Sequence, residues 1–287
     1  QFKYNQIDSP MGERIVQECR GIILDEKGNW QVVARPFDKF FNYGEGHAAP
    51  IDWDSARAME KLDGSLIIFY NYGGSWHVAT SGMPDASGDV GGFGMTFEAL
   101  FWEIWEQAGY KLPYGQEHYT LMFELTSPYN RIIVNNRDFR LTLLGVRNRR
   151  TGCELPPDVM GQQHGYNVVR EFPLTSLDDV LKTFDTMDPL KQEGYVIVDD
   201  KHQRIKVKHP GYVALHHMKS SASPKSFLEV IRSGESSELT AHFPEYTEIV
   251  VDITGRYDQL IADLESAYAE IQHIEVQKEF ALEAVKS

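Results

Sequence analysis

The stretch AMEKLDGSLIIFY, residues 58–70, places a lysine two residues before an Asp-Gly pair in an otherwise apolar segment. Its apolar residues have the composition of two core strands, and Lys61, Asp63, Gly64 and Ser65 have the composition of the turn that joins them. Taken alone, the pattern indicates a hairpin with a solvated lysine, because short motifs match by accident. A chemical role for Lys61 therefore depends on what the rest of the chain provides.

Composition describes an ordinary globular protein. The chain has 287 residues, of which 42% are hydrophobic, 24% charged and 12% aromatic, enough for a main body with an appendage. No apolar run approaches the roughly 18–20 residues that cross a bilayer, so no membrane partner is expected. The two cysteines form no metal-type spacing, which favours the reducing cytoplasm.

The charge of the chain is unevenly distributed. The formal net charge is −14, whereas a protein that binds nucleic-acid phosphates usually has a basic surface. Residues 226–287 hold 13 acidic and 4 basic side chains, a net charge of −9, which leaves −5 on residues 1–225. The larger part carries basic clusters at RNRR (147–150) and KHQRIKVKH (201–209), so a local basic patch is compatible with the acidic total.

Strand patterns dominate the first two thirds of the chain. Eight short segments are rich in β-branched and aromatic residues and are bounded by Gly, Asn, Asp or Pro. They are GIILD (21–25), WQVVARP (30–36), SLIIFYN (65–71), SWHVATS (75–81), YTLMFELTS (119–127), RLTLLGVRN (140–148), EGYVIVDD (193–200) and RIKVKHP (204–210). They predict a system of mostly antiparallel sheets.

Helical patterns are few until the C-terminal part. Apolar residues share one face in 93–109, and 174–187 has Ser176 and Asp179 at the spacing of a capping box. After residue 222 helical signals take over, with SPKSFLEVIRSG at 223–234 and a three-four apolar spacing from Tyr257 onward. We therefore predict an α+β body over residues 1–222 and a small all-helical C-terminal subdomain over 223–287.

Strand-like segments elsewhere supply groups that would suit a nucleophilic lysine. At neutral pH a lysine with an ordinary pKa of about 10.4 is almost entirely protonated, so little of the nucleophilic free amine is present. Nearby cations or burial lower the pKa and so raise the fraction of free amine. Lys206 and Lys208 are two apart, hence on one face of a strand, where an anion such as phosphate would relieve their repulsion. Glu124 and Glu193 stand in or beside apolar strands. Taken singly, these groups are more typical of a solvated lysine pair and of carboxylates at strand ends than of an active site.

The order KLDGS, FELTSPYNRI, LLGVRN, EGYVIV and KVK resembles the motifs of the covalent nucleotidyltransferases, which comprise ATP-dependent DNA and RNA ligases and capping enzymes. With ECRGIIL (18–24), RPFDKFFN (35–42) and YVALHHMKSS (212–221), the chain is identified as a member of the tRNA-repair RNA ligase family of the T-even phages. The resemblance runs from about Tyr4 to about Glu238 and implies an ATP-grasp-like ligase domain.

The resemblance implies a reaction in three steps. Lys61 would attack the α-phosphate of ATP, form lysyl-AMP and release pyrophosphate. AMP would pass to an RNA 5′-phosphate, and a 3′-hydroxyl would then displace it. Partners would be RNA ends, as in a nicked tRNA, and we expect a monomer in the cytoplasm, the host's cytoplasm for a phage protein.

Roles for individual residues follow from the same resemblance. Contacts with ATP are implied for Tyr4, Arg20, Lys39, Phe41, Glu60, Gly64, Glu124, Lys206 and Lys208. Catalytic roles are implied for Lys61, Glu193, Lys206 and Lys208. A divalent metal, Mg²⁺ or Mn²⁺, is implied because pyrophosphate is a highly charged leaving group, with Glu193 and Glu238 as its ligands.

The sequence departs from the family pattern in three places. Ser81 stands where the phage enzyme has a lysine twenty residues after the nucleophile, so Lys219 or Arg131 would have to supply that phosphate contact. Ser237 and Glu238 stand where the phage enzyme has a metal-binding aspartate. The stretch after residue 222 is also shorter than the C-terminal domain of the phage ligase, so its tRNA preference does not carry over.

Two alternatives remain open at this point. A DNA ligase or capping guanylyltransferase shares the central motifs, although the segments around Arg20 and Lys39 favour an RNA ligase. A catalytically silent nucleotide-binding or RNA-binding module would have little need for Lys61. The glycine-rich GDVGGFG, residues 88–94, fits no phosphate-binding template and is predicted to be a loop.

Overall fold

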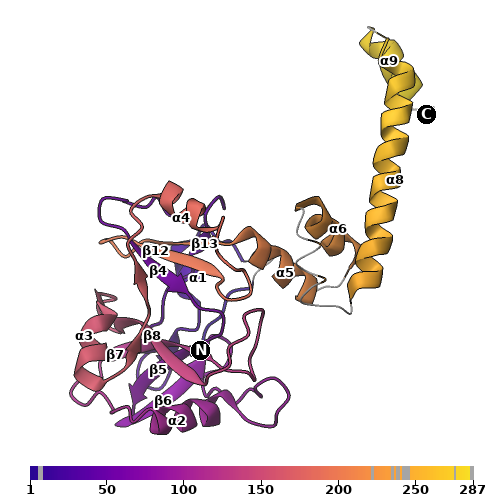
Figure 1. The fold of residues 1–287 in the computed structure, drawn as a ribbon. Coiled ribbons are helices and arrows are strands. Elements are labelled where there is room, and N and C mark those ends of the chain that lie inside the picture. The colour runs from indigo at the N-terminus through magenta and orange to yellow at the C-terminus, as the bar shows by residue number, and fades with distance from the viewer. Residues whose placement is uncertain are drawn as a thin grey trace. The chain divides into compact units, whose positions relative to one another are not determined.

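The computed structural model describes residues 1–5, 9–220, 223–233, 236, 240, 246–274 and 276–284. The chain divides into two compact units, Gln1–Tyr212 and Val213–Ser287 (Figure 1). The domain boundary expected after residue 222 falls outside the described residues and stays a prediction.

The first unit contains two large sheets and a short ribbon. In spatial order, the six-stranded sheet consists of β10 (Asn167–Val168), β8 (Arg140–Asn148), β7 (Tyr119–Thr126), β5 (Ser65–Tyr72) and β6 (Ser75–Thr80), with β9 (Glu154–Leu155) also paired to β8. The five-stranded sheet consists of β11 (Glu171–Phe172), β4 (Arg57–Lys61), β12 (Gly194–Val198), β13 (Arg204–Lys208) and β3 (Phe41–Asn42). The ribbon pairs β1 (Ile23–Asp25) with β2 (Gln31–Ala34).

The strand predictions are confirmed, because each of the predicted segments contains a strand. The pairing is antiparallel except for β10 with β8 and β13 with β3. The four strands that the sequence pattern missed, β3, β9, β10 and β11, are each two residues long. A strand that short shows no alternation, so only its neighbours in space define it.

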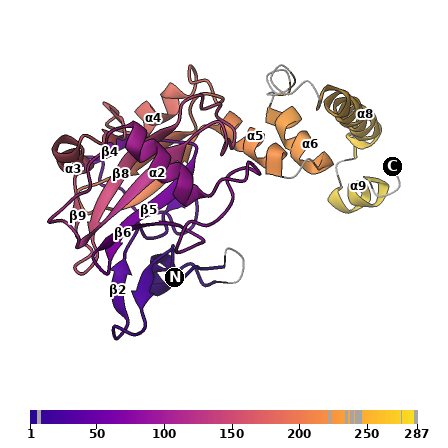
Figure 2. The ribbon, with the colours of Figure 1, turned by 90° about the horizontal axis from the view of Figure 1, so that it is seen from below.

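One helix covers the outer face of the six-stranded sheet. Helix α2 (Phe97–Gln107) runs alongside β5 and β8 in the ribbon (Figure 2). It buries Leu100, Phe101, Ile104 and Trp105 in a core shared with β5, β7 and β8. It begins four residues later than predicted, because the Thr96 hydroxyl accepts the backbone N–H of Ala99 and caps the first turn.

A second core lies on the outer face of the five-stranded sheet. Helix α4 (Leu177–Thr183) packs Val180 against Ala58, Tyr195 and Ile197. The predicted cap is present, since the Ser176 hydroxyl accepts the backbone N–H of Asp179. On its other face, the six-stranded sheet packs Ile68, Tyr70 and Ala79 against the β1–β2 ribbon. The facing surfaces of the two large sheets meet in a small core that includes Met59, Val198 and Leu144, and the rest of those surfaces lines a space between the sheets. Two further short helices, α1 (Arg14–Glu18) and α3 (Pro157–His164), complete this unit.

The described residues of the second unit are helical, apart from short connections. Its helices are α6 (Pro224–Ser233), α8 (Thr247–Ile271) and α9 (Gln277–Ala284), and α5 (Pro210–Ser220) runs across the boundary between the units. Helix α8 begins ten residues before Tyr257, because Val250 and Ile253 are buried in contact with α6 although β-branched residues and Gly255 weaken helix propensity. Among the described residues no helix is long and apolar enough to cross a membrane. The α+β prediction is confirmed.

Candidate active site

The turn that follows Lys61 is fixed by the buried carboxylate of Asp63. Its Oδ2 accepts the backbone N–H groups of Ile133 and Val134 at 2.8 and 2.6 Å, and its Oδ1 accepts the Tyr212 hydroxyl at 2.9 Å. Moving Asp63 would leave several buried donors unpaired, which is costly. Lys61 therefore extends from a rigid point of the fold.

Gly64 completes this turn by allowing two strands to approach closely. A Cβ atom at Gly64 would lie 2.4 Å from the carbonyl oxygen of Leu125 in β7. Any other residue would push β5 away from β7, so the glycine of the motif has a structural reason in addition to its predicted contact with ATP.

Glu193 joins Lys61 to Lys208. Its Oε2 lies 2.7 Å from Lys61 Nζ and its Oε1 lies 2.8 Å from Lys208 Nζ, and only 4% of the Glu193 side chain is exposed. Strand register explains the geometry, since Gly194 pairs with Lys61 on one side and with Lys208 on the other. One buried carboxylate thus holds two ammonium groups beside each other.

Strand β13 presents lysines to the space between the sheets. Ile205 and Val207 are buried in the outer core, so Lys206 and Lys208 point to the opposite face, as predicted. Burial, followed by the charges of Arg20, Lys61, Lys39 and Lys208, lowers the pKa of Lys206 from 10.5 to about 7. Lys206 is therefore poised to gain charge when an anion arrives.

Two cations lie against the ring of Phe40. The guanidinium carbon of Arg20 and the Nζ of Lys206 are each 5.0 Å from the centre of its ring. Burial lowers the pKa of Arg20, and its Nη1 is buried without a hydrogen-bond partner among the described residues. A buried guanidinium nitrogen without an acceptor fits the binding of an anionic ligand at this point.

Lys39 sits over two aromatic rings. Its Nζ is 5.2 Å from the ring centre of Tyr4 and 5.5 Å from that of Phe41. The backbone N–H of Lys39 donates to the carbonyl of Gln17 at 2.7 Å, which ties this segment to α1. The four predicted residues Tyr4, Arg20, Lys39 and Phe41 thus lie close together, although Tyr4 and Phe41 are 37 positions apart.

Glu124 is the second predicted carboxylate of the site. Burial raises its pKa to about 8, with Glu193 and Asp63 acting in the same direction and Lys61 and Arg20 opposing it. At neutral pH this carboxyl group is therefore mainly protonated, so it can donate as well as accept a hydrogen bond.

A cavity of about 290 Å³ lies between the two sheets and contains most of the predicted residues. Seven of them line it: Arg20, Glu60, Lys61, Gly64, Glu124, Lys206 and Lys208. The rest of the lining is mostly apolar, including Met59, Leu66, Leu144 and Val196, together with the polar side chains of Arg57, Glu154, His202 and Arg204. Lys39 and Phe41 line a neighbouring cavity of about 490 Å³, which shares Phe37, Phe40 and Arg204 with the first. Charged groups on one part of the wall suit the phosphates of a nucleotide, and apolar groups on another part suit its base.

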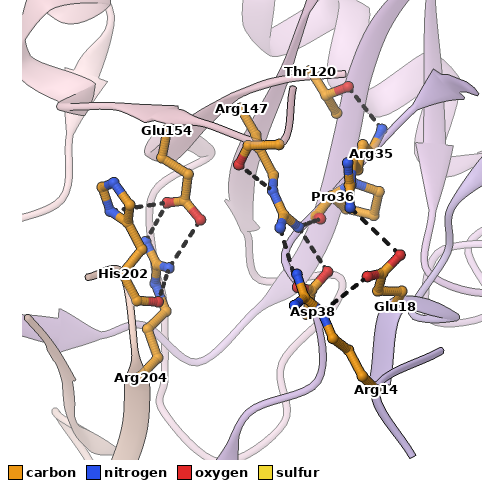
Figure 3. A network of polar contacts seen from close by, with 11 residues as sticks. Arg14, Glu18, Arg35, Pro36, Asp38, Thr120, Arg147, Glu154, His202 and Arg204 are labelled. Carbon is orange, nitrogen blue, oxygen red and sulfur yellow. Dashed lines mark hydrogen bonds and ion pairs between the residues drawn. The ribbon is translucent and has the colours of Figure 1, made fainter. Parts of the chain in front are cut away.

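Ion pairs hold the segment 35–41 that carries Lys39 and Phe41 (Figure 3). Arg147 donates to both carboxylate oxygens of Asp38, at 2.7 and 3.1 Å, and to the carbonyl of Pro36 at 2.8 Å. Arg204 and Glu154 line the same cavity as Lys39 and Phe41. They form a two-point ion pair that joins β13 to β9. The basic cluster at 147–150 thus includes a buried, paired arginine.

Comparisons with known proteins agree with this geometry. The profile of a family described as RNA ligase matches residues 18–212. This chain belongs to the RNA ligase family. The match supports the RNA ligase interpretation of the sequence and not the alternatives.

Similar proteins include an RNA ligase of Rhodothermus phage RM378, 26% identical over 87% of this chain and 71% of the phage protein. A candidate bifunctional polynucleotide kinase/RNA ligase of Autographa californica nuclear polyhedrosis virus is 30% identical over 87% of this chain, which spans only 38% of the viral protein. Among solved structures, a candidate ATP-dependent DNA ligase from Aquifex aeolicus shares the fold, with a TM-score of 0.50 and 14% identity over 90% of this chain and 72% of that one.

Other residues that the family resemblance singled out have different outcomes. Glu238 and Ser237 lie outside the described residues, so the metal role of Glu238 stays a prediction. Ser81 is exposed. The next residue, Gly82, lies close to Lys3, since a Cβ atom at Gly82 would be 3.7 Å from Lys3 Nζ. Lys3 also pairs with Arg20 through the backbone. Lys3 is therefore a further candidate, beside Arg131, for the charge that Ser81 lacks. The side chain of Lys219 lies outside the described residues, so its role stays a prediction.

The described part of the chain contains no group of three or more His, Cys, Asp or Glu side chains that would enclose a metal ion. Mg²⁺ needs less, because it commonly binds through one or two carboxylates together with substrate phosphates and water. Glu193 fits that arrangement, since each of its oxygens has a second acceptor position beyond its lysine partner.

Sequence reasoning missed several residues of the site. Asp63 and Tyr212 anchor the nucleophile turn, Phe40 contacts both Arg20 and Lys206, and Arg147 with Asp38 holds the segment of Lys39. Asp63 and Phe40 both stand inside quoted motifs, so the signal was present. Their roles depend on partners that are remote in the sequence.

Proposed function

We propose that this chain is an ATP-dependent RNA ligase that joins an RNA 5′-phosphate to a 3′-hydroxyl through a lysyl-AMP intermediate at Lys61. The observation that carries the proposal is the Glu193 carboxylate between Lys61 and Lys208, beside a cavity between two sheets. An amine held by a buried carboxylate next to surplus cations suits attack on a phosphate.

In the first step, Lys61 Nζ attacks the α-phosphorus of ATP. A P–N bond forms, the bond from the α-phosphorus to the oxygen of the β-phosphate breaks, and pyrophosphate leaves. Glu193, 2.7 Å away, orients the amine and is the nearest group to accept its proton. Lys206 and Lys208 neutralise the charge that develops on the α-phosphate oxygens.

The remaining predicted residues hold the nucleotide. Glu124, protonated at neutral pH, both donates to and accepts from the ribose hydroxyls, and Glu60 contacts the adenine edge. Arg20 and Lys39 bind the outer phosphates, in a pocket shaped by Tyr4 and Phe41. The unpartnered Nη1 of Arg20 supports this assignment.

A bound Mg²⁺ or Mn²⁺ supplies charge neutralisation for the pyrophosphate leaving group. Glu193 is the described residue that would hold it, with Glu238 as the second predicted ligand.

In the second step an oxygen of the RNA 5′-phosphate attacks the α-phosphorus of lysyl-AMP, the P–N bond breaks, and Lys61 is regenerated. In the third step the 3′-hydroxyl attacks the RNA phosphorus, a phosphodiester bond forms, and AMP leaves. Lys206 and Lys208 assist both steps, because negative charge develops on phosphate oxygens each time. A nicked tRNA, a monomeric enzyme and a cytoplasmic location complete the proposal.

The test is covalent labelling of the chain. Protein first treated with pyrophosphate, to remove any bound AMP, is mixed with Mg²⁺ and ATP labelled at the α-phosphate and is then denatured. We expect an acid-labile label on the wild type and on Lys191→Ala, a control at an exposed lysine, but not on Lys61→Ala. A wild type that does not label would contradict the proposal, and labelling from GTP in preference to ATP would favour a capping enzyme.

A further inference from the structure

Three aromatic side chains form a continuous surface in the first unit. The rings of Phe93 and Tyr129 stack with centres 4.5 Å apart, and Tyr129 meets Phe139 edge to face at 5.0 Å. Phe93 is 62% exposed and Phe139 is 39% exposed. Single exposed aromatic residues are ordinary, but three rings in contact at the surface form a platform.

The glycine-rich stretch 88–94 builds one side of this platform. Gly91 has a φ of 63°, and a Cβ atom there would lie 2.1 Å from the carbonyl oxygen of Tyr129. Only glycine permits this approach, which brings Phe93 onto the Tyr129 ring. The loop that matches no phosphate-binding template therefore serves to place an exposed aromatic ring.

Arginines neighbour two of the aromatic residues, Tyr129 and Phe139, in the sequence. The segment 128–140 contains Arg131, Arg137 and Arg140 against the single acid Asp138, a net charge of +2 in a chain whose formal net charge is −14. All three arginines are exposed, and in the described part of the chain no carboxylate lies within ion-pair distance of Arg137 or Arg140. Local positive charge on an acidic protein fits an anionic partner.

The same segment is hydrogen-bonded to the nucleophile turn. Ile133 and Val134 donate to the Asp63 carboxylate, and the Asn136 side chain donates to the Asp63 carbonyl at 2.9 Å. The Asn130 side chain donates to the Ser65 hydroxyl at 3.0 Å. Asp63 is two residues from Lys61, so a polymer on this surface lies next to the site of adenylylation.

From these observations we propose that an unpaired RNA strand binds to the surface formed by Phe93, Tyr129, Phe139, Arg131, Arg137 and Arg140, which we call the aromatic-arginine surface. Bases stack on the exposed rings, and the arginines contact the phosphates. This combination is typical of proteins that bind single strands, because every base has a face that stacks and the backbone is uniformly charged. The proposal rests on the proposed ligase function for the identity of the polymer.

The experiment measures the affinity of the full chain for a fluorescent single-stranded RNA of mixed sequence by anisotropy. We expect the double variant Phe93→Ala/Phe139→Ala to bind at least about 25-fold more weakly, because each of the two lost stacking contacts weakens binding by about fivefold or more. Phe93→Tyr/Phe139→Tyr keeps both rings and should bind as the wild type does. Tyr114→Ala removes a ring that is 74% exposed elsewhere in the unit and should have no effect.

Salt dependence tests the arginines separately. Arg137→Ala should weaken binding at low salt and flatten the dependence of affinity on salt, because one phosphate contact is lost. Arg150→Ala, at another exposed arginine, should not. Thermal unfolding of each variant reports that it is folded.

Unchanged RNA affinity in the double alanine variant overturns the proposal, as does an equal loss in Tyr114→Ala. A duplex RNA bound more tightly than the single strand also overturns it. Labelling of the wild type by ATP, measured separately, tests the ligase function. A wild type that binds RNA through these rings without labelling would overturn that function and leave the surface standing.

Discussion

Glu193 stands between Lys61 and Lys208, with one carboxylate oxygen 2.7 Å from the first ammonium group and the other 2.8 Å from the second. The arrangement combines positions 61, 193 and 208 through the register of three neighbouring strands. The carboxylate is nearly inaccessible to solvent and contacts both ammonium groups. In the absence of substrate it is therefore the group that neutralises the charge of these lysines.

Glu193→Gln should lower the rate of labelling by α-labelled ATP by about 100-fold or more, since the variant keeps the shape but loses the charge that orients the amine and accepts its proton. Glu171→Gln, at a half-exposed carboxylate paired with Arg57, is the matched control. Equal rates for wild type and Glu193→Gln would exclude a catalytic role for this carboxylate.

Lys206 should make nucleotide binding pH-dependent. Its pKa of about 7 means that it is mostly charged at pH 6 and mostly neutral at pH 8, and a bound phosphate raises that pKa again. Binding of an ATP analogue with a methylene group between the α- and β-phosphates should therefore take up about one more proton at pH 8 than at pH 6 through Lys206.

The measurement is calorimetric titration in buffers of different ionisation enthalpy. Lys206→Arg, which stays charged throughout, isolates the contribution of Lys206 from those of Glu124 and the nucleotide. The same proton uptake in both proteins would show that another group is responsible.

The parts of the fold that could be predicted are those with a local pattern. Segments such as RIKVKHP show β-branched composition and alternation, which place Lys206 and Lys208 on one face before any partner is known. The two-residue strands could not be found in this way, and neither could the start of α8, where packing of Val250 and Ile253 outweighs propensity.

The candidate site divides in the same way. The order of the motifs predicts roles for Lys61, Glu193, Lys206 and Lys208, because a resemblance to a family assigns a role to each residue from its position in a motif. It could not identify why Asp63 stands in the motif, since the donors from residues 133, 134 and 212 are distant in sequence. The ion pair of Arg147 with Asp38 likewise joins residues that are distant in the sequence, so the sequence alone could not predict it.

Asp63→Asn should lower the free energy of unfolding by about 2–4 kcal/mol, because two buried backbone donors and the Tyr212 hydroxyl lose a charged acceptor. Tyr212→Phe should cost about 1 kcal/mol, and the two changes together should cost less than their sum because they remove one shared contact. Denaturant unfolding measures all three, with the exposed Asp54→Asn as control. Strict additivity would contradict the contact.

Arg147→Met should both destabilise the fold and weaken ATP binding. The side chain of Arg147 is 9% exposed and holds Asp38 and Pro36, so its loss frees the segment that carries Lys39. We expect a loss of about 3 kcal/mol in the free energy of unfolding. At a temperature where the variant is folded, we also expect a raised KM for ATP in the labelling reaction, whereas an unchanged KM would separate this ion pair from the position of Lys39.

Lys3 should supply the charge that Ser81 does not. Its ammonium lies beside Gly82, and its backbone pairs with Arg20, so both basic groups approach the nucleotide from the same side. Lys3→Ala should weaken binding of the methylene ATP analogue by about tenfold, as expected for the loss of a charged hydrogen bond. Ser81→Lys in the same chain should restore the affinity, because it returns a positive charge to that segment. Lys27→Ala, at an exposed lysine, should change nothing. Wild-type affinity in Lys3→Ala, or no recovery with Ser81→Lys, would show that the phosphate contact comes from elsewhere.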